Sequence, residues 1–187
     1  MKRYAFSLVA AVALLLSGCR ASGPGTPAHT VAEFFRKYDG RPGFHTTEWS
    51  AGLTTRLLLG RLGSTLGGDN ELAQALTAVR STKVLAFAPT STSARQLTNE
   101  GLSQEVDQLL RNEKYTPLAT AGTDSSTATL RYAVRQQGDR VQEMVATGHL
   151  ANALDSFVLV DVGGNFTRAQ AESLAKFLPN VVRETAP

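Results

Sequence analysis

Asp161 is the one charged residue in the apolar segment from Phe157 to Val162, and it is the first candidate for a chemical role. A carboxylate among apolar side chains must be paired with a cation or must shift its pKa. Carboxylate pairs can perform acid–base catalysis, and Asp155 is the partner that the spacing offers. Six residues apart on one strand, the two aspartates share a face but lie well separated, because each residue rises about 3.3 Å. A salt bridge from Asp161 to an arginine on a neighbouring strand explains it more simply than catalysis.

Gly163-Gly164-Asn165 precedes a predicted helix. Backbone N–H groups at a helix N-terminus can bind an anion. The end of a strand and close helix packing explain the same glycines, and this structural interpretation is favoured. The tentative ligand-binding residues are therefore Gly164, Asn165 and Asp161, and no catalytic residue is predicted.

The sequence gives little support for a metal site or for nucleophilic catalysis. His29, His45 and His149 lie in separate segments, and the chain has no His-x-x-x-His or Cys-x-x-Cys spacing. It also has no Gly-x-Ser-x-Gly elbow. We expect no metal, no cofactor and no enzymatic activity, with a hydrolase using Asp161 as the least favoured alternative.

Cys19, the only cysteine, ends a segment typical of a secretory signal. Lys2 and Arg3 precede an apolar run from Phe6 to Leu16, which is followed by Ser17 and Gly18. A run of about a dozen apolar residues is too short to cross a bilayer, which needs about 20. The Leu-Ser-Gly-Cys ending resembles the bacterial lipobox, in which the cysteine receives diacylglycerol and an N-acyl chain. The resemblance implies a signal peptide over residues 1–18 that is removed, and lipidation of Cys19.

Two or three acyl chains anchor a protein stably, whereas one binds only marginally. Residues 19–26 read as a short flexible tether, which keeps the following domain near the membrane. Arg20 stands where an aspartate would favour retention at the inner membrane. The predicted location is therefore the bacterial cell envelope, at the outer membrane and facing the periplasm.

The formal net charge of +3 includes Lys2 and Arg3, so the mature chain is near +1 by side chains. A nucleic-acid-binding domain would need clustered basic residues. The remaining cations alternate with acids and polar residues, which indicates a solvated face rather than a nucleic-acid site.

Residues 27–187 form one predicted domain. Its expected helices cover 30–40, 52–62 with Ser50 as the cap, a segment capped by Asp69, 94–113, and a last helix capped by Thr167 with Gln170. Its expected strands cover 44–48, 84–88, 115–121, 127–136, 141–147 and 157–162, the last ended by Gly163-Gly164. Gly138-Asp139 forms a hairpin turn. This order predicts an α+β domain with a mostly antiparallel sheet of about four to six strands packed with helices.

Four segments carry a resemblance to a known family: Phe34 to Tyr38, the strand from Val84 to Phe87, the Gly138-Asp139 hairpin, and Val158 to Phe166. They resemble the lipoprotein family catalogued as domain of unknown function 4252. The likeness covers nearly the whole mature chain, and its motifs are packing motifs. It implies an α+β lipoprotein domain and brings no activity and no catalytic residues.

Two functions remain open at this level. The first is a membrane-anchored adaptor that binds an envelope protein partner and exposes an apolar patch. The alternative is a small-ligand binding module with a concave site for a lipid or an anion.

Overall fold

The computed structural model describes residues 25–50, 70–89, 91–119, 128–150 and 153–185. The elements follow one another in this order: α2 (Val31–Tyr38), β1 (Phe44–Ser50), α4 (Asn70–Ala78), β2 (Val79–Phe87), α5 (Thr92–Gln96), the π-helical segment η1 (Leu97–Leu102), α6 (Ser103–Asn112), β3 (Thr116–Pro117), β4 (Ala128–Gln137), β5 (Arg140–Leu150), β6 (Ala153–Phe166) and α7 (Arg168–Thr185).

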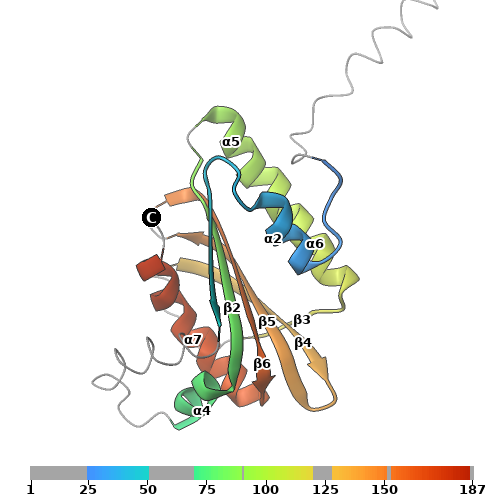
Figure 1. Cartoon of the computed structure of the whole chain (residues 1–187), viewed down its shortest axis with the longest axis vertical. Coiled ribbons are helices and arrows are strands. Elements are labelled where there is room, and N and C mark those ends of the chain that lie inside the picture. Colours follow the sequence, from blue (N-terminus) through green and yellow to red (C-terminus); the bar gives the residue numbers. More distant parts are fainter. Residues whose placement is uncertain (1–24, 51–69, 90, 120–127, 151–152, 186–187) are drawn as a thin grey trace, which may run out of the picture.

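The six strands form one sheet in the order β1-β2-β6-β5-β4-β3, and every pair is antiparallel. Helices α2 and α6 lie on one face of this sheet, and α4 and α7 lie on the other (Figure 1). The predicted α+β class with an antiparallel sheet is confirmed. Within the described ranges, no helix combines the length and apolar character needed to span a bilayer.

Each face of the sheet has its own apolar core. Under α2 and α6 the core is aromatic, and it includes Phe34, Tyr38, Phe44, Phe87 and Phe157. Under α4 and α7 the core is aliphatic and lies against alternate residues of the same strands, such as Val84, Val158 and Val160. The central strand β6 is therefore buried on both faces from Phe157 to Val160, as the apolar sequence of this segment predicts.

Helix α2 begins where the capping pattern predicts. The Thr30 side chain accepts a hydrogen bond from the Glu33 amide at 3.1 Å. The carboxylate of Glu33 accepts from the His29 amide at 2.9 Å, one residue before the expected position. The four apolar residues on one stripe, Val31, Phe34, Phe35 and Tyr38, are all buried. The cap of α7 follows the prediction directly, because Thr167 and Gln170 bond each other's backbone amides.

The long helix predicted over 94–113 is interrupted by the π-helical segment η1 between α5 and α6. A π-turn inserts a residue into the helical repeat and shifts the phase of the faces that follow. Leu102, Val106 and Leu109 are buried on one side of α6, whereas Leu110 is only partly buried.

Several strands differ in length from their predictions. Strand β2 begins at Val79 rather than at Val84, because it pairs with β6 as far as Gly164. Strand β3 holds only Thr116 and Pro117 instead of running from Tyr115 to Ala121, although Ala121 itself lies outside the described residues. Proline has no N–H to extend the ladder, which fits an edge strand that stops there.

The predicted end of β6 at Gly163-Gly164 is wrong, because the strand continues to Phe166. A Cβ on Gly164 would lie 2.1 Å from Cζ of Phe166 and 2.7 Å from the carbonyl oxygen of Ala78. This glycine is therefore required by close packing inside the sheet, between two register shifts of the neighbouring strands. The hairpin turn at Gly138-Asp139 is confirmed, with Gly138 at φ +64°.

Some predictions fall on residues that the structure does not describe. These are the signal segment with Cys19, most of the tether, the helix over 52–62, and the cap at Asp69. Ser50, the predicted cap of the 52–62 helix, is the last residue of β1.

Candidate functional site

A row of charged side chains crosses the sheet on the face that carries α2 and α6. Its members come from five neighbouring strands; we call them the charged band, and they are Glu48 of β1, Lys83 of β2, Asp161 of β6, Glu143 of β5 and Arg135 of β4. Glu48 stands opposite Lys83, and Lys83 stands opposite Asp161. Glu143 stands opposite Arg135 and is two residues from Val145, the direct partner of Asp161. The band is thus continuous from one strand to the next.

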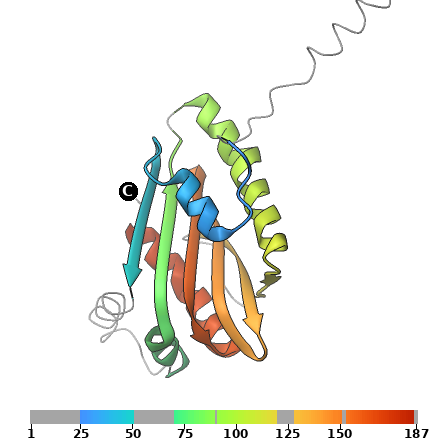
Figure 2. The same ribbon diagram turned by 45° about the vertical axis from the view of Figure 1, so that its right-hand side comes forward.

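The charged band lies beyond the part of the sheet that the helices cover. In Figure 2, α2 and α6 lie in front of the upper half of the sheet, and no described helix lies in front of the lower half. The side-chain exposures agree: 61% for Glu48, 36% for Lys83 and 46% for Arg135. Leu85 and Leu159, two residues along from Lys83 and Asp161, are on the same face of the sheet because side chains alternate along a strand. These two leucines lie under the helices, in the aromatic core.

The two cations of the band already have carboxylate partners. Nζ of Lys83 lies 3.2 Å from Oε1 of Glu48. The guanidinium of Arg135 donates a hydrogen bond to Oε2 of Glu143, whose side chain is only 16% exposed. Asp161 lies between these pairs, and its Oδ1 atom has no hydrogen-bond partner among the described residues.

The surroundings of Asp161 raise its pKa from an ordinary value of 3.8 to about 8. Burial is the largest cause, and the negative charge of Glu143 is the next. Lys83 and Arg135 act in the opposite direction but do not offset these effects. Asp161 therefore favours its protonated form at a higher pH than an ordinary aspartate does. The predicted salt bridge to an arginine is wrong within the described part of the chain, because Arg135 is bonded to Glu143.

Tyr115 lies beside the same acids. The residue is 8% exposed. Its hydroxyl makes no hydrogen bond of ordinary geometry to a described residue, but Glu143 is close enough to act on it as a hydrogen-bond acceptor. Burial and then the charge of Glu143 raise its pKa above the ordinary range of a tyrosine, with Asp161 contributing less. The guanidinium of Arg135 lies 5.7 Å from the centre of the Tyr115 ring, within the range of a cation–π contact.

The other residues singled out in the sequence are placed apart from Asp161. Asp155 lies on β6 and makes an ion pair of 3.3 Å with Arg95, so the two aspartates of the strand do not meet. Gly164 and Asn165 also lie inside β6 rather than at the helix N-terminus that an anion site was predicted to use. Oδ1 of Asn165 accepts from Nε of Arg140 at 3.0 Å, which ties β6 to the start of β5.

The three histidines lie in different elements, as their separation predicts. His29 and His45 are exposed, and Nδ1 of His149 bonds the carbonyl oxygen of Ser156. Among the described residues, no group of three or more histidine, cysteine or acidic side chains is placed to hold a metal ion.

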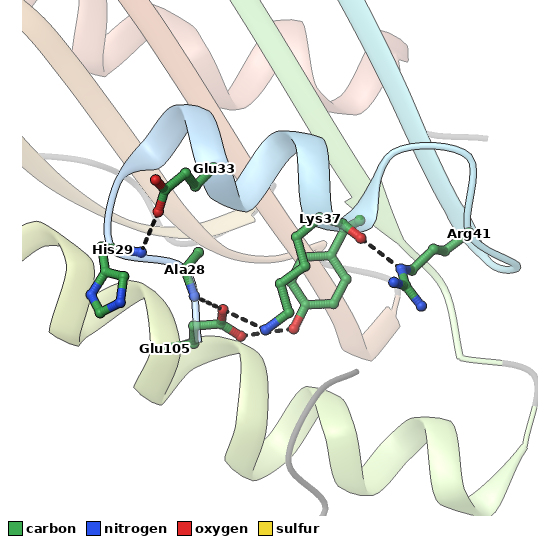
Figure 3. Close-up of polar contacts among 7 residues, drawn as sticks. Ala28, His29, Glu33, Lys37, Arg41 and Glu105 are labelled. Carbon is green, nitrogen blue, oxygen red and sulfur yellow. Dashed lines mark hydrogen bonds and ion pairs between the residues drawn. The ribbon is translucent and has the colours of Figure 1, made fainter. Parts of the chain in front are cut away.

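A second carboxylate, Glu105 of α6, is buried at 9% exposure and has a full set of donors (Figure 3). Its Oε1 accepts from the Ala28 amide at 2.6 Å and from Nζ of Lys37 at 2.7 Å. Its Oε2 accepts from the Tyr38 hydroxyl at 2.8 Å. Near the end of α6, Glu113 accepts from the Val31 amide at 2.7 Å. We call Glu105 with its three donors the Glu105 clamp, because it fixes the start of the domain to α6.

Of these residues, only Asp161 stands out in the sequence, whereas the positions of Lys83, Glu143, Tyr115 and Glu105 give no such signal. Alternation along β4 and the hairpin turn place Arg135 close to Glu143, and this was the available signal. A regular two-residue turn would pair Arg135 with Gln142, but a register shift pairs it with Glu143. No sequence pattern predicts that register shift.

Comparison with known proteins gives one match. No curated protein and no solved structure resembles the chain significantly. The family model described as domain of unknown function (DUF4252) matches residues 55–174, which is more than half of the chain. The match includes the strands β2 to β6 and every member of the charged band except Glu48. The chain therefore belongs to the DUF4252 family.

Proposed function

We propose that this protein is a lipid-anchored module of the bacterial cell envelope that binds a protein partner through the charged band, without catalysing a reaction. The observation that carries the proposal is the band itself, on the half of a sheet face where no described helix lies. Charged side chains on strands commonly lie at the solvent-exposed end of a sheet. A carboxyl group with a raised pKa among them lowers the stability of the fold at neutral pH. Binding sites commonly retain such groups.

The anchor rests on the sequence around Cys19. The nine residue-to-residue steps from Cys19 to Ala28 span at most about 30 Å, because each extended step covers roughly 3.5 Å. The Glu105 clamp holds Ala28 on the domain, so the tether cannot lengthen by peeling the following residues away. A partner would therefore be met close to the membrane, at its periplasmic side.

One observation favours a hydrolase as the second candidate. The pKa of Asp161 is raised beside Glu143, which is paired with Arg135, and an acid with a raised pKa beside a second carboxyl group is an arrangement that glycosidases use. We prefer a partner-binding site, because the band extends over five strands and has an ion pair at each end, Glu48 with Lys83 and Glu143 with Arg135.

Photocrosslinking in intact cells tests the proposal. A photoreactive residue replaces Glu48 at the edge of the band, and in a matched variant it replaces Glu172 of α7. Both acids are well exposed, at 61% and 40%, and both form a surface ion pair with a neighbouring cation. The full-length chain is used, with Cys19→Ala as the unanchored control.

We expect one defined envelope protein to be crosslinked from position 48, not from position 172, and to be lost with Cys19→Ala. Equal capture from both positions would contradict a partner at the band. Unchanged capture with Cys19→Ala would contradict the anchor. No partner at position 48, in a preparation whose lipidation is verified by mass spectrometry, would favour a small ligand instead.

A further inference from the structure

The charged band has three carboxyl groups and two cations, so an ionised Asp161 would lack a counter-ion. Its two ion pairs are Glu48 with Lys83 and Glu143 with Arg135. The charged groups that act on Asp161 are Glu143 from β5, Lys83 from β2 and Arg135 from β4. Because both cations are already bonded to other acids, the described residues hold no further positive charge for Asp161.

The Tyr115 hydroxyl is a second, independent sign of an incomplete site. It is buried on a residue that is only 8% exposed, and it makes no hydrogen bond of ordinary geometry to a described residue. It lies near Glu143, which acts on it as a charge and as a hydrogen-bond acceptor, and near Asp161. Buried hydroxyls in native proteins are almost always bonded, so this hydroxyl beside two acids indicates a polar site that a further group can complete.

We propose that this gap receives the ammonium or guanidinium group of a lysine or arginine side chain from the partner protein, which bonds to Asp161 and Glu143 together. The inference rests on the proposed function, and it specifies the chemistry of the partner. An ammonium has three donors and no acceptor, so it can serve two carboxyl groups and the oxygen of Tyr115.

The arrangement of charges favours a cation over other ligands. An anion would approach Glu143 and would have to displace it from Arg135. A metal ion would need more than the two carboxylates that the described part of the band presents near Tyr115. The cationic group of a partner side chain needs only hydrogen-bond acceptors from this site, because the rest of the partner provides its other contacts.

Binding of this cation is linked to release of a proton. With no ligand, Asp161 keeps its proton up to about pH 8. The incoming positive charge favours the carboxylate, so the proton leaves when the cation binds. Between pH 6 and pH 8 the affinity should therefore rise, by up to about tenfold per pH unit.

The experiment uses the full-length chain in neutral detergent, labelled with carbon-13, and follows the side-chain carboxyl carbon of Asp161 by NMR. The probe is the peptide acetyl-Gly-Lys-Gly-amide, and the neutral control has norleucine in place of lysine. We expect millimolar lysine peptide to lower the pKa of Asp161 by at least about one unit. The norleucine peptide should leave it unchanged. The dissociation constant of the lysine peptide should fall at least about fivefold from pH 6 to pH 8.

Asp161→Asn should remove the pH dependence, and the matched change Glu172→Gln on α7 should retain it. An Asp161 carboxyl that is already ionised at pH 6 in the purified chain would overturn the inference, because a cation would then be in place. The same conclusion would follow if the lysine and norleucine peptides acted alike.

Failure of this inference is distinguishable from failure of the proposed function. Crosslinking from position 48 without any effect of the lysine peptide would retain the partner and reject its basic side chain. An effect of the lysine peptide without a crosslinked partner would retain the cation site and reject the adaptor role.

Discussion

Glu105 and Asp161 are carboxylates on the same side of the sheet, but their surroundings differ in the donors they supply. Glu105 receives a backbone amide, an ammonium and a phenol hydroxyl. Asp161 has one oxygen with no described partner, and its nearest influences are burial and a second acid. Both groups are withdrawn from water, so the difference lies in what replaces the water.

This comparison separates a structural carboxylate from a candidate for binding. A buried charge contributes to stability only when hydrogen bonds and an opposite charge compensate its desolvation. The Glu105 clamp meets that condition and fixes the start of α2 to α6. Asp161 does not meet it, so its carboxyl is held in the neutral form at the expense of folding stability above pH 4.

Glu105→Ala should produce the largest effect. The substitution leaves the Ala28 amide, the Lys37 ammonium and the Tyr38 hydroxyl without their acceptor. Removal of one partner of a buried charged network typically costs about 4 kcal/mol. We expect the free energy of unfolding, measured by urea denaturation, to fall by about that amount. A fall of less than about 1 kcal/mol, the level of an exposed ion pair, would show that water replaces Glu105 readily.

Asp161→Asn should have the opposite sign. Below about pH 4 the carboxyl is protonated in both the folded and the unfolded chain; between pH 4 and pH 8 only the folded chain holds the proton. Stability of the wild type therefore falls as pH rises through this window. Asparagine resembles the neutral acid and carries no such penalty. We expect the variant to be more stable than the wild type by about 2 kcal/mol at pH 8, after allowing for partial solvent contact.

Urea denaturation of both proteins at pH 4, 6 and 8 measures this difference. The gap should be near zero at pH 4 and should widen toward pH 8. A variant that is less stable at every pH would instead indicate that the ionised carboxylate of Asp161 has a cation partner in the free protein. Glu172→Gln, on the exposed face of α7, is the matched control and should leave the pH profile unchanged.

Lys37→Met tests how much of the Glu105 clamp depends on charge. The lysine side chain is 12% exposed and lies 2.7 Å from Glu105, so its loss removes the only formal counter-charge of the clamp. The amide of Ala28 and the hydroxyl of Tyr38 remain as donors. We therefore expect a loss of about 1 kcal/mol, smaller than for Glu105→Ala. A loss as large as that of Glu105→Ala would show that the ion pair with Lys37 accounts for the whole stabilising effect of the Glu105 clamp.

Much of the fold follows from local patterns in the sequence. The apolar stripe of α2, the hairpin turn at Gly138-Asp139 and the cap at Thr167 each depend on a few neighbouring residues. Gly163 and Gly164 predicted the wrong end of β6, because a glycine pair commonly ends a strand. Here the requirement for Gly164 is set by Phe166, two residues along the same strand, and by the carbonyl of Ala78, which is distant in the sequence.

The candidate site was predictable only in its central residue. Asp161 stands out because it is the one charged residue in an apolar strand. Its neighbours depend on strand order and register: β2 lies next to β6 although about seventy residues separate them, and a register shift sets the partner of Arg135. Glu105 was hidden because a lone glutamate in a helix looks like a solvated residue until α2 packs on it.

Lys83→Met is the mildest change and examines the band directly. The positive charge of Lys83 holds the pKa of Asp161 down, so its removal should raise that pKa above about 8. Stability should change little, because the partner Glu48 is 61% exposed and remains hydrated. Carbon-13 NMR titration of the Asp161 carboxyl carbon measures the shift, and Arg168→Met, which breaks the surface pair with Glu172, serves as the control. An unchanged pKa would mean that solvent screens Lys83 from Asp161, and the band would then consist of separate surface pairs rather than one coupled site.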